Sequence, residues 1–124
     1  MKQNRPKNLN LFTIRLPINA LVSILHRVSG MGLFLLLPLV LWGLHASLSN
    51  EAGYLQVLTV LNHWFIKLIL IGFSWAFFHH FYAGIRHLAQ DVHWMHGLDQ
   101  ARNSSRVLMG LVVVSVLYFA FLIW

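Results

Sequence analysis

The residues best suited to chemistry lie in one stretch near the middle of the chain. His80, Gly84, His87 and Asp91 are spaced at i, i+4, i+7 and i+11. At about 100° per residue, these four positions fall within an arc of roughly 60° on an α-helix. If this stretch is helical, one face presents a histidine, a gap one turn further on, and then a second histidine and a carboxylate.

The imidazole of His80 fits two interpretations from its spacing alone. It can be a buried histidine that hydrogen-bonds to a neighbouring helix, or it can be an axial ligand of a heme iron. In the second case the porphyrin edge would use the space beside Gly84. The heme propionates would need cationic or hydrogen-bonding partners, and His26, Arg27 and His87 are available for that role.

His79 is adjacent to His80 and therefore points about 100° away from it on a helix. The two side chains cannot ligate one iron from the same side, so we expect His79 to be a structural or interfacial histidine. A six-coordinate heme needs a second axial ligand, and no other histidine of this sequence lies deep within a long apolar segment. The sequence thus predicts a partner subunit that supplies the second ligand.

Ser23, His26 and Arg27 form a second polar group, just before the first long apolar segment. Ser23 and Arg27 are four residues apart and would share one face of a helix. A hydroxyl and a guanidinium can together donate hydrogen bonds to a quinone carbonyl and stabilise the negative charge that develops on its reduction. The alternative is that Arg27 only sets the topology at the lipid headgroups and Ser23 is a local cap. The residues by themselves favour this alternative.

Other kinds of site have little support in the sequence. The chain contains no cysteine, which excludes disulfides, thiolate-bound iron–sulfur clusters and cysteine nucleophiles. His93 and His96 have a spacing that could suit a metal, but only Asp91 and Asp99 lie near enough in sequence to add ligands. We therefore expect a solvated loop there. The sequence has no serine–histidine–acid set, phosphate-binding loop or pair of catalytic carboxylates.

Three long apolar segments must hold these residues in place. Hydrophobic residues make up 58% of the 124 residues and charged residues only 10%, whereas a soluble domain has about 25% charged residues. Spans over residues 28–49, 64–88 and 106–124 are each long enough to cross a hydrocarbon core of roughly 30 Å. The sequence predicts an all-α membrane protein with three transmembrane helices, in one membrane-anchor domain over residues 1–124. Residues 16–26 should form a short N-terminal interfacial helix, and residues 50–53 a turn.

The basic residues define an orientation. If the spans are as given, eight of the nine Lys and Arg residues share one side of the membrane: Lys2, Arg5, Lys7, Arg15, Arg27, Arg86, Arg102 and Arg106. Only Lys67 belongs to the opposite side. By the positive-inside rule the N-terminus should be cytoplasmic and the C-terminus should be outside. This arrangement also explains the net charge of +6 without a nucleic-acid partner.

Two separated motifs resemble one known family. The runs RPKNLNL at residues 5–11 and SILHRVSG at residues 23–30 are similar to the N-terminal signature of the succinate dehydrogenase cytochrome b subunit. The run HFYAGIRHLAQD at residues 80–91 resembles the second signature of that family, H-x-x-x-G-I-R-H-L-x-x-D. The signature requires one histidine where this chain has the pair His79-His80, and the three-residue gap to Gly84 selects His80.

The resemblance implies the larger membrane anchor of a heteromeric helix bundle within a four-subunit respiratory complex. Such a subunit is not an enzyme alone: a flavoprotein subunit oxidises succinate, and an iron–sulfur subunit passes electrons to ubiquinone beside the two anchors. The reaction belongs to both electron transport and the tricarboxylic acid cycle. The resemblance also implies a multi-pass protein of the bacterial inner membrane, with a cytoplasmic N-terminus and a periplasmic C-terminus.

The family's residue roles can be carried over by position. His80 matches the axial ligand of the heme b iron, with the second ligand on the sister membrane anchor. Ser23 and Arg27 match residues that line the ubiquinone pocket, while His26, Arg27 and His87 fall where the family contacts the heme propionates. No catalytic residue for succinate oxidation is expected in this chain.

Two alternatives stay open. The nearest is a fumarate reductase-type anchor, which differs in its motifs and heme content. The other is a small transporter subunit, which would need polar residues in several spans. The first and third spans offer almost none beyond His45 and Ser115.

Overall fold

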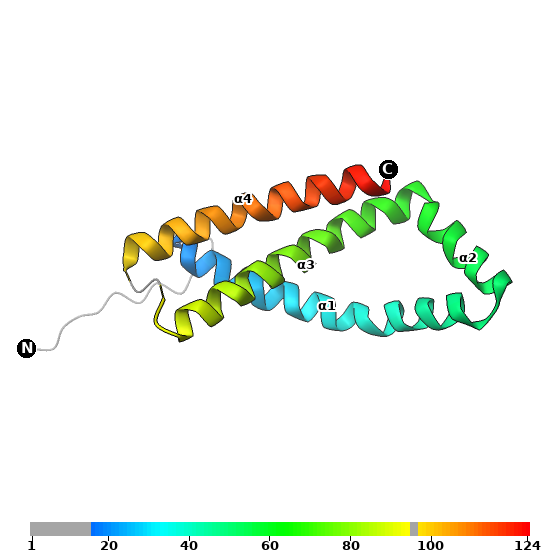
Figure 1. Ribbon diagram of the computed structural model, residues 1–124, viewed down its shortest axis with the longest axis horizontal. Coiled ribbons are helices and arrows are strands. Elements are labelled where there is room, and N and C mark those ends of the chain that lie inside the picture. Colours follow the sequence, from blue (N-terminus) through cyan, green and yellow to red (C-terminus); the bar gives the residue numbers. More distant parts are fainter. Residues whose placement is uncertain (1–15, 95–96) are drawn as a thin grey trace, which may run out of the picture.

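The computed structural model describes residues 16–94 and 97–124, which form four helices with short connections and no strand (Figure 1). These are α1 (Ile18–Ser49), α2 (Glu51–Asn62), α3 (Trp64–Asp91) and α4 (Leu98–Ile123). The helices α1, α3 and α4 are long and apolar enough to cross a membrane. The all-α prediction with three transmembrane helices is thus confirmed.

Helix α1 is longer than the span expected for it. Pro17 precedes it in an extended conformation, with φ −64° and ψ 151°, which suits a residue that has no N–H to donate. The turns that were expected to form a separate interfacial helix are the first turns of α1, because no helix-breaking residue separates them from the apolar segment. Pro38 lies inside α1 without ending it, as is common in transmembrane helices. The polar turn before the span is therefore held rigidly on the span itself.

Helix α2 was not foreseen, since only a turn was expected there. Asn50 has extended backbone and caps α2, its side chain accepting a hydrogen bond from the Gly53 N–H at 2.8 Å. Glu51 lies in the first turn, where its carboxylate interacts favourably with the positive end of the helix dipole. A Cβ at Gly53 would clash with the backbone oxygen of Ala46, so glycine allows α2 to fold back closely against α1. The helix links the ends of α1 and α3 where the two diverge (Figure 1).

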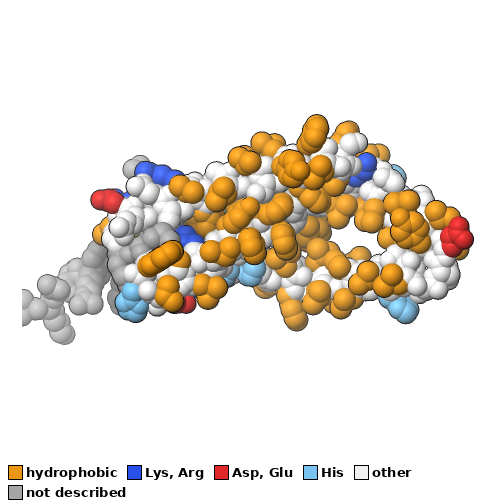
Figure 2. All heavy atoms as spheres, viewed as in Figure 1, with side chains coloured by type: hydrophobic (Ala, Val, Ile, Leu, Met, Phe, Trp, Pro, Cys, Tyr) orange, Lys and Arg blue, Asp and Glu red, His pale blue; other side chains and the backbone are white. Residues whose placement is uncertain are grey.

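The packed core lies at the other end, where α1, α3 and α4 meet. Its buried residues come from all three helices: Val22, Ala83, Leu108 and Val112. Away from this core, apolar side chains cover most of the visible surface between the two ends of the molecule (Figure 2). Such a surface suits lipid or neighbouring membrane helices rather than water.

Polar side chains hold α4 against the other two helices. The Tyr82 and Ser115 hydroxyls are 2.9 Å apart across α3 and α4, and the Ser105 hydroxyl donates to Asn19 Oδ1 of α1 at 2.9 Å. Arg86 is buried, and its guanidinium donates to Ser104 Oγ and to the backbone oxygen of Ala101. Such interhelical bonds are worth roughly 0.6–2 kcal/mol each in membrane proteins. The end of α3 is thus fixed to the start of α4.

The core makes a prediction about Ala83, which is fully buried among the three helices. Replacing it by leucine (Ala83→Leu) should overpack this contact and cost about 1–3 kcal/mol of stability. Thermal unfolding of the purified protein in detergent would show this as a lower melting temperature. Ile85→Leu is the matched control, because Ile85 is exposed two residues away. Equal melting temperatures for the two variants would contradict the close packing around Ala83.

Candidate functional site

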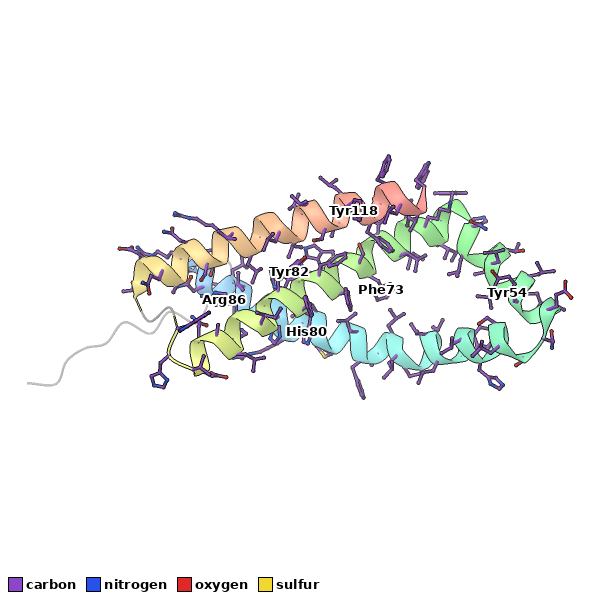
Figure 3. The ribbon with its side chains drawn as sticks, viewed as in Figure 1. Tyr54, Phe73, His80, Tyr82, Arg86 and Tyr118 are labelled. Carbon is purple, nitrogen blue, oxygen red and sulfur yellow. The ribbon has the colours of Figure 1, made fainter. Side chains whose placement is uncertain are left out.

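His80 lies half-buried where α3 packs against α1, and Figure 3 shows it between these two helices. Its Nδ1 atom is 3.0 Å from the backbone oxygen of His26. A carbonyl oxygen only accepts, so Nδ1–H is the donor and Nε2 carries the free lone pair. A metal-ligating histidine that binds through Nε2 typically has its other nitrogen engaged in this way.

Three imidazoles from two helices cluster around this contact. The His26 ring is stacked on the His80 ring, with centroids 4.2 Å apart and an interplanar angle of 7°. The centroid of His87 is 5.0 Å from that of His26, at an interplanar angle of 55°. Helical spacing placed His80 and His87 on one face of α3, and the packing of α1 adds His26 to them.

A glycine on α1, rather than the one on α3, makes room for the His80 ring. A Cβ at Gly30 would lie 2.7 Å from Cε1 and 3.0 Å from Nδ1 of His80, which is too close. A Cβ at Gly84 would instead lie 3.5 Å from Nε2 of His26, an ordinary contact. The space expected beside Gly84 was for a porphyrin edge and stays a prediction, whereas the room that the His80 ring itself needs is provided by Gly30.

Ser23 and Arg27 lie one turn apart on α1. Ser23 is half-buried and Arg27 is exposed. Within residues 16–94 and 97–124, neither side chain has a hydrogen-bond partner. A hydroxyl and a guanidinium are therefore both available to a group that comes from outside the chain.

His79 points into the three-helix core. It is fully buried, its Nε2 lies 3.3 Å from the backbone oxygen of Val22, and its ring stacks on Trp75 at 5.3 Å. Nε2–H must donate to the carbonyl, which leaves the Nδ1 lone pair buried without a partner among the described residues. An unsatisfied buried acceptor costs about 1–3 kcal/mol. These contacts agree with the structural role expected for His79.

The end of α3 offers little to a ligand. Asp91 is exposed, and its backbone oxygen is 3.1 Å from Nδ1 of the exposed His93. In the part of the chain that the structure describes, no group of three or more His, Cys, Asp or Glu side chains could hold a metal ion. His96 lies outside the described residues.

Two parts of the site were missed by the sequence analysis. No feature of the sequence connected Gly30 with His80, although Gly30 lies one turn after His26. Carbonyl oxygens such as those of Val22 and His26 carry no signal in a sequence. Their roles become visible only once the contact between α1 and α3 is known.

Comparison with known proteins identifies the family. Residues 1–120 match the family model described as succinate dehydrogenase/fumarate reductase transmembrane subunit. The chain belongs to this family. This match confirms the identification made from the two motifs. A member of this family is a membrane subunit of a larger enzyme and not an enzyme by itself.

Similar proteins from several organisms are named as cytochrome b556 or b560 subunits of succinate dehydrogenase. The chain is 36% identical to the succinate dehydrogenase cytochrome b556 subunit of Paracoccus denitrificans over 115 residues, covering 92% of this chain and 88% of the relative. It is also 36% identical to the cytochrome b556 subunit of Coxiella burnetii over 126 residues, covering 100% of both chains. A succinate dehydrogenase cytochrome b560 subunit from Reclinomonas americana is 30% identical over 122 residues, covering 94% of this chain and 85% of the relative.

Proposed function

We propose that this chain is one membrane-anchor domain that holds heme b and ubiquinone in a succinate dehydrogenase. Electrons would pass from an iron–sulfur subunit to ubiquinone beside this chain, while a flavoprotein subunit oxidises succinate. The observation that carries the proposal is the engagement of His80: Nδ1–H donates to the His26 carbonyl, so Nε2 keeps its lone pair for iron. The family also includes fumarate reductase subunits, but the relatives cited above are all named for succinate dehydrogenase.

The residues around His80 fit a heme. His80 would be one axial ligand, with the other on the sister membrane anchor, and His26, Arg27 and His87 would bind the propionates. A bound heme b supplies one-electron redox chemistry. The protein's part is to orient the His80 ring through the His26 carbonyl and to keep room for it at Gly30. The basic and imidazole side chains at propionate level offset negative charge near the apolar interior.

Ser23 and Arg27 suit a quinone headgroup. Both can donate hydrogen bonds, and both lack a partner among the described residues. A guanidinium also stabilises negative charge that develops on the quinone oxygen as it is reduced. We infer that these two residues form this chain's share of the quinone pocket, which the iron–sulfur subunit and the sister anchor complete.

We also propose that the chain is a multi-pass protein of the bacterial inner membrane with a cytoplasmic N-terminus and a periplasmic C-terminus. The beginning of α1, the end of α3 and the beginning of α4 lie at one end of the molecule (Figure 1). Arg86, Arg102 and Arg106 belong to these segments, whereas Lys67 is near the start of α3 at the other end. This asymmetry supports the orientation by the positive-inside rule.

The proposed heme ligand can be tested by His80→Ala. Removing the imidazole should abolish the reduced-minus-oxidised heme b band of the complex co-purified in mild detergent, because one axial ligand is lost. His45→Ala is the matched control, since His45 is an exposed histidine toward the far end of α1. An unchanged heme band in the His80 variant would refute the ligand assignment.

Gly30→Ala tests whether the space that Gly30 leaves on α1 determines the orientation of the His80 ring. The added methyl group would overlap the far end of the His80 side chain, so the ring must move while the backbone is spared. Disturbing the orientation of a metal ligand typically costs about 10- to 100-fold in affinity. Heme titration of the complex should therefore show a loss of heme affinity of about 10- to 100-fold.

Gly32→Ala provides the control for this substitution. It lies on the same helix two residues away, and a Cβ there would meet nothing within 4 Å. Its heme affinity should stay at the wild-type value. If Gly30→Ala and Gly32→Ala bound heme equally well, the structural role assigned to Gly30 would be wrong.

The quinone role predicts a separation of two activities. Ser23→Ala and Arg27→Ala should each reduce ubiquinone turnover, by about 10- to 100-fold for the arginine, since a hydrogen bond to a charged group is worth roughly 1.5–3 kcal/mol. Succinate oxidation by an artificial soluble acceptor should be spared. Arg102→Ala is the control, because this exposed arginine pairs only weakly with Asp99, at 3.8 Å. Equal loss of both activities would count against a quinone site.

A further inference from the structure

Two adjacent histidines of α3 hold two backbone carbonyls of α1. His79 Nε2 is 3.3 Å from the Val22 oxygen, and His80 Nδ1 is 3.0 Å from the His26 oxygen. The two carbonyls are four residues apart, which is about one helical turn. The donors point in different directions around α3, yet both reach the same side of α1.

Paired bonds of this kind fix α1 more strictly than apolar packing does. A slide of α1 by one residue moves each carbonyl by about 1.5 Å and turns it by about 100°, which would break both hydrogen bonds. The bond from His79 is buried, with Val22 and Ala83 fully buried in the same core, so no water can replace this donor; the bond from His80 is part-buried. The axial position and the rotation of this turn of α1 are therefore both defined.

The turn that is held in this way carries the proposed quinone ligands. Ser23 directly follows Val22, and Arg27 directly follows His26. Each residue is thus next to a carbonyl that α3 fixes. His80 holds one of these carbonyls as part of its role as the proposed heme ligand, whereas His79 holds the other and has no role in the proposed function.

The chemistry of His79 supports a geometric role over a stabilising one. A phenylalanine could stack on Trp75 in the same place without leaving a buried nitrogen unpaired, as happens at His79 Nδ1. What the imidazole adds to such a ring is one directional hydrogen bond to the Val22 carbonyl. That bond restrains the backbone beside Ser23.

We propose that His79 is a positioning residue for the quinone site, which sets the turn of α1 at Ser23 relative to the His80 ring without contacting quinone or heme. This inference rests on the proposed function for the identity of the ligands that are positioned. The restraint on α1 itself rests on the two hydrogen bonds and the burial of His79.

The test compares three variants within the assembled complex. His79→Phe keeps the ring beside Trp75 and removes the donor, whereas His79→Gln keeps an N–H donor near the position of Nε2. Tyr82→Phe is the matched control: it removes a hydrogen bond from the same helix, but one that joins α3 to Ser115 of α4. Three properties are measured for each variant: ubiquinone KM and kcat, the heme spectrum, and amide hydrogen exchange of the peptide covering residues 18–30.

His79→Phe should raise the ubiquinone KM roughly three- to tenfold, as expected for losing one restraining hydrogen bond, with a smaller change in kcat. It should also raise amide exchange in residues 18–30 and shift the heme band. His79→Gln should restore all three values toward wild type. Tyr82→Phe should lower the melting temperature while leaving the KM and the exchange of residues 18–30 unchanged.

A His79→Phe complex with wild-type KM, heme band and exchange, and only a lower melting temperature, would overturn the proposal. If this variant does not assemble, His79→Gln decides: wild-type KM and exchange support the proposal, and a raised KM contradicts it. The proposed function would instead be refuted if the wild-type complex showed no heme band and the Ser23→Ala complex reduced ubiquinone at the wild-type rate. Amide exchange in residues 18–30 of the His79→Phe complex would then still show whether His79 restrains this turn. Exchange at the wild-type rate would exclude such a restraint.

Discussion

The hydrogen bond from the His80 ring to the His26 carbonyl is the interaction on which the site depends. In the apolar interior of a membrane a polar nitrogen without a partner is costly, so the bond that an imidazole makes there decides which of its nitrogens stays available. The α1 carbonyl satisfies Nδ1 and thereby leaves Nε2 as the nitrogen that can bind iron. Gly30 is required by the same contact, because the ring can reach that carbonyl only where α1 has no side chain.

The helices are packed most closely where this contact is made. Residues from α1, α3 and α4 bury one another beside the histidines, and α4 is tied to this end through Arg86 and Ser105. Toward the other end α1 and α3 diverge, and α2 connects them (Figure 1). Because α1 continues through the polar turn without a break, the turn with Ser23 and Arg27 moves with the span and not as a separate segment. A rigid support of this kind suits the proposed site, which would hold two ligands at a fixed separation.

Helical periodicity was enough to predict much of this arrangement. The three apolar segments were recognisable by length, and the spacing of His80 and His87 placed both on one face because both belong to one helix. The stacking of His26 on His80 joins two helices, and no spacing within one helix encodes it. Helix α2 was missed because its start, Asn50 and Glu51, has the residue types of a turn as well as those of a helix cap.

The polar groups that remain unpaired indicate how the subunit is completed. Arg27 and Ser23 have no partner among the described residues, and His80 uses only one of its two nitrogens in a hydrogen bond. These groups all lie near the turn of α1 that receives two hydrogen bonds from α3 at its backbone carbonyls. The surrounding helices expose broad apolar surface (Figure 2). An exposed guanidinium at the level of the headgroups is stable by itself, but a guanidinium that acts on a quinone must be shielded from water to exert its full electrostatic effect. In the proposed function the neighbouring subunits would provide that shielding, so this chain would supply the donors and their geometry while its partners would supply the enclosure.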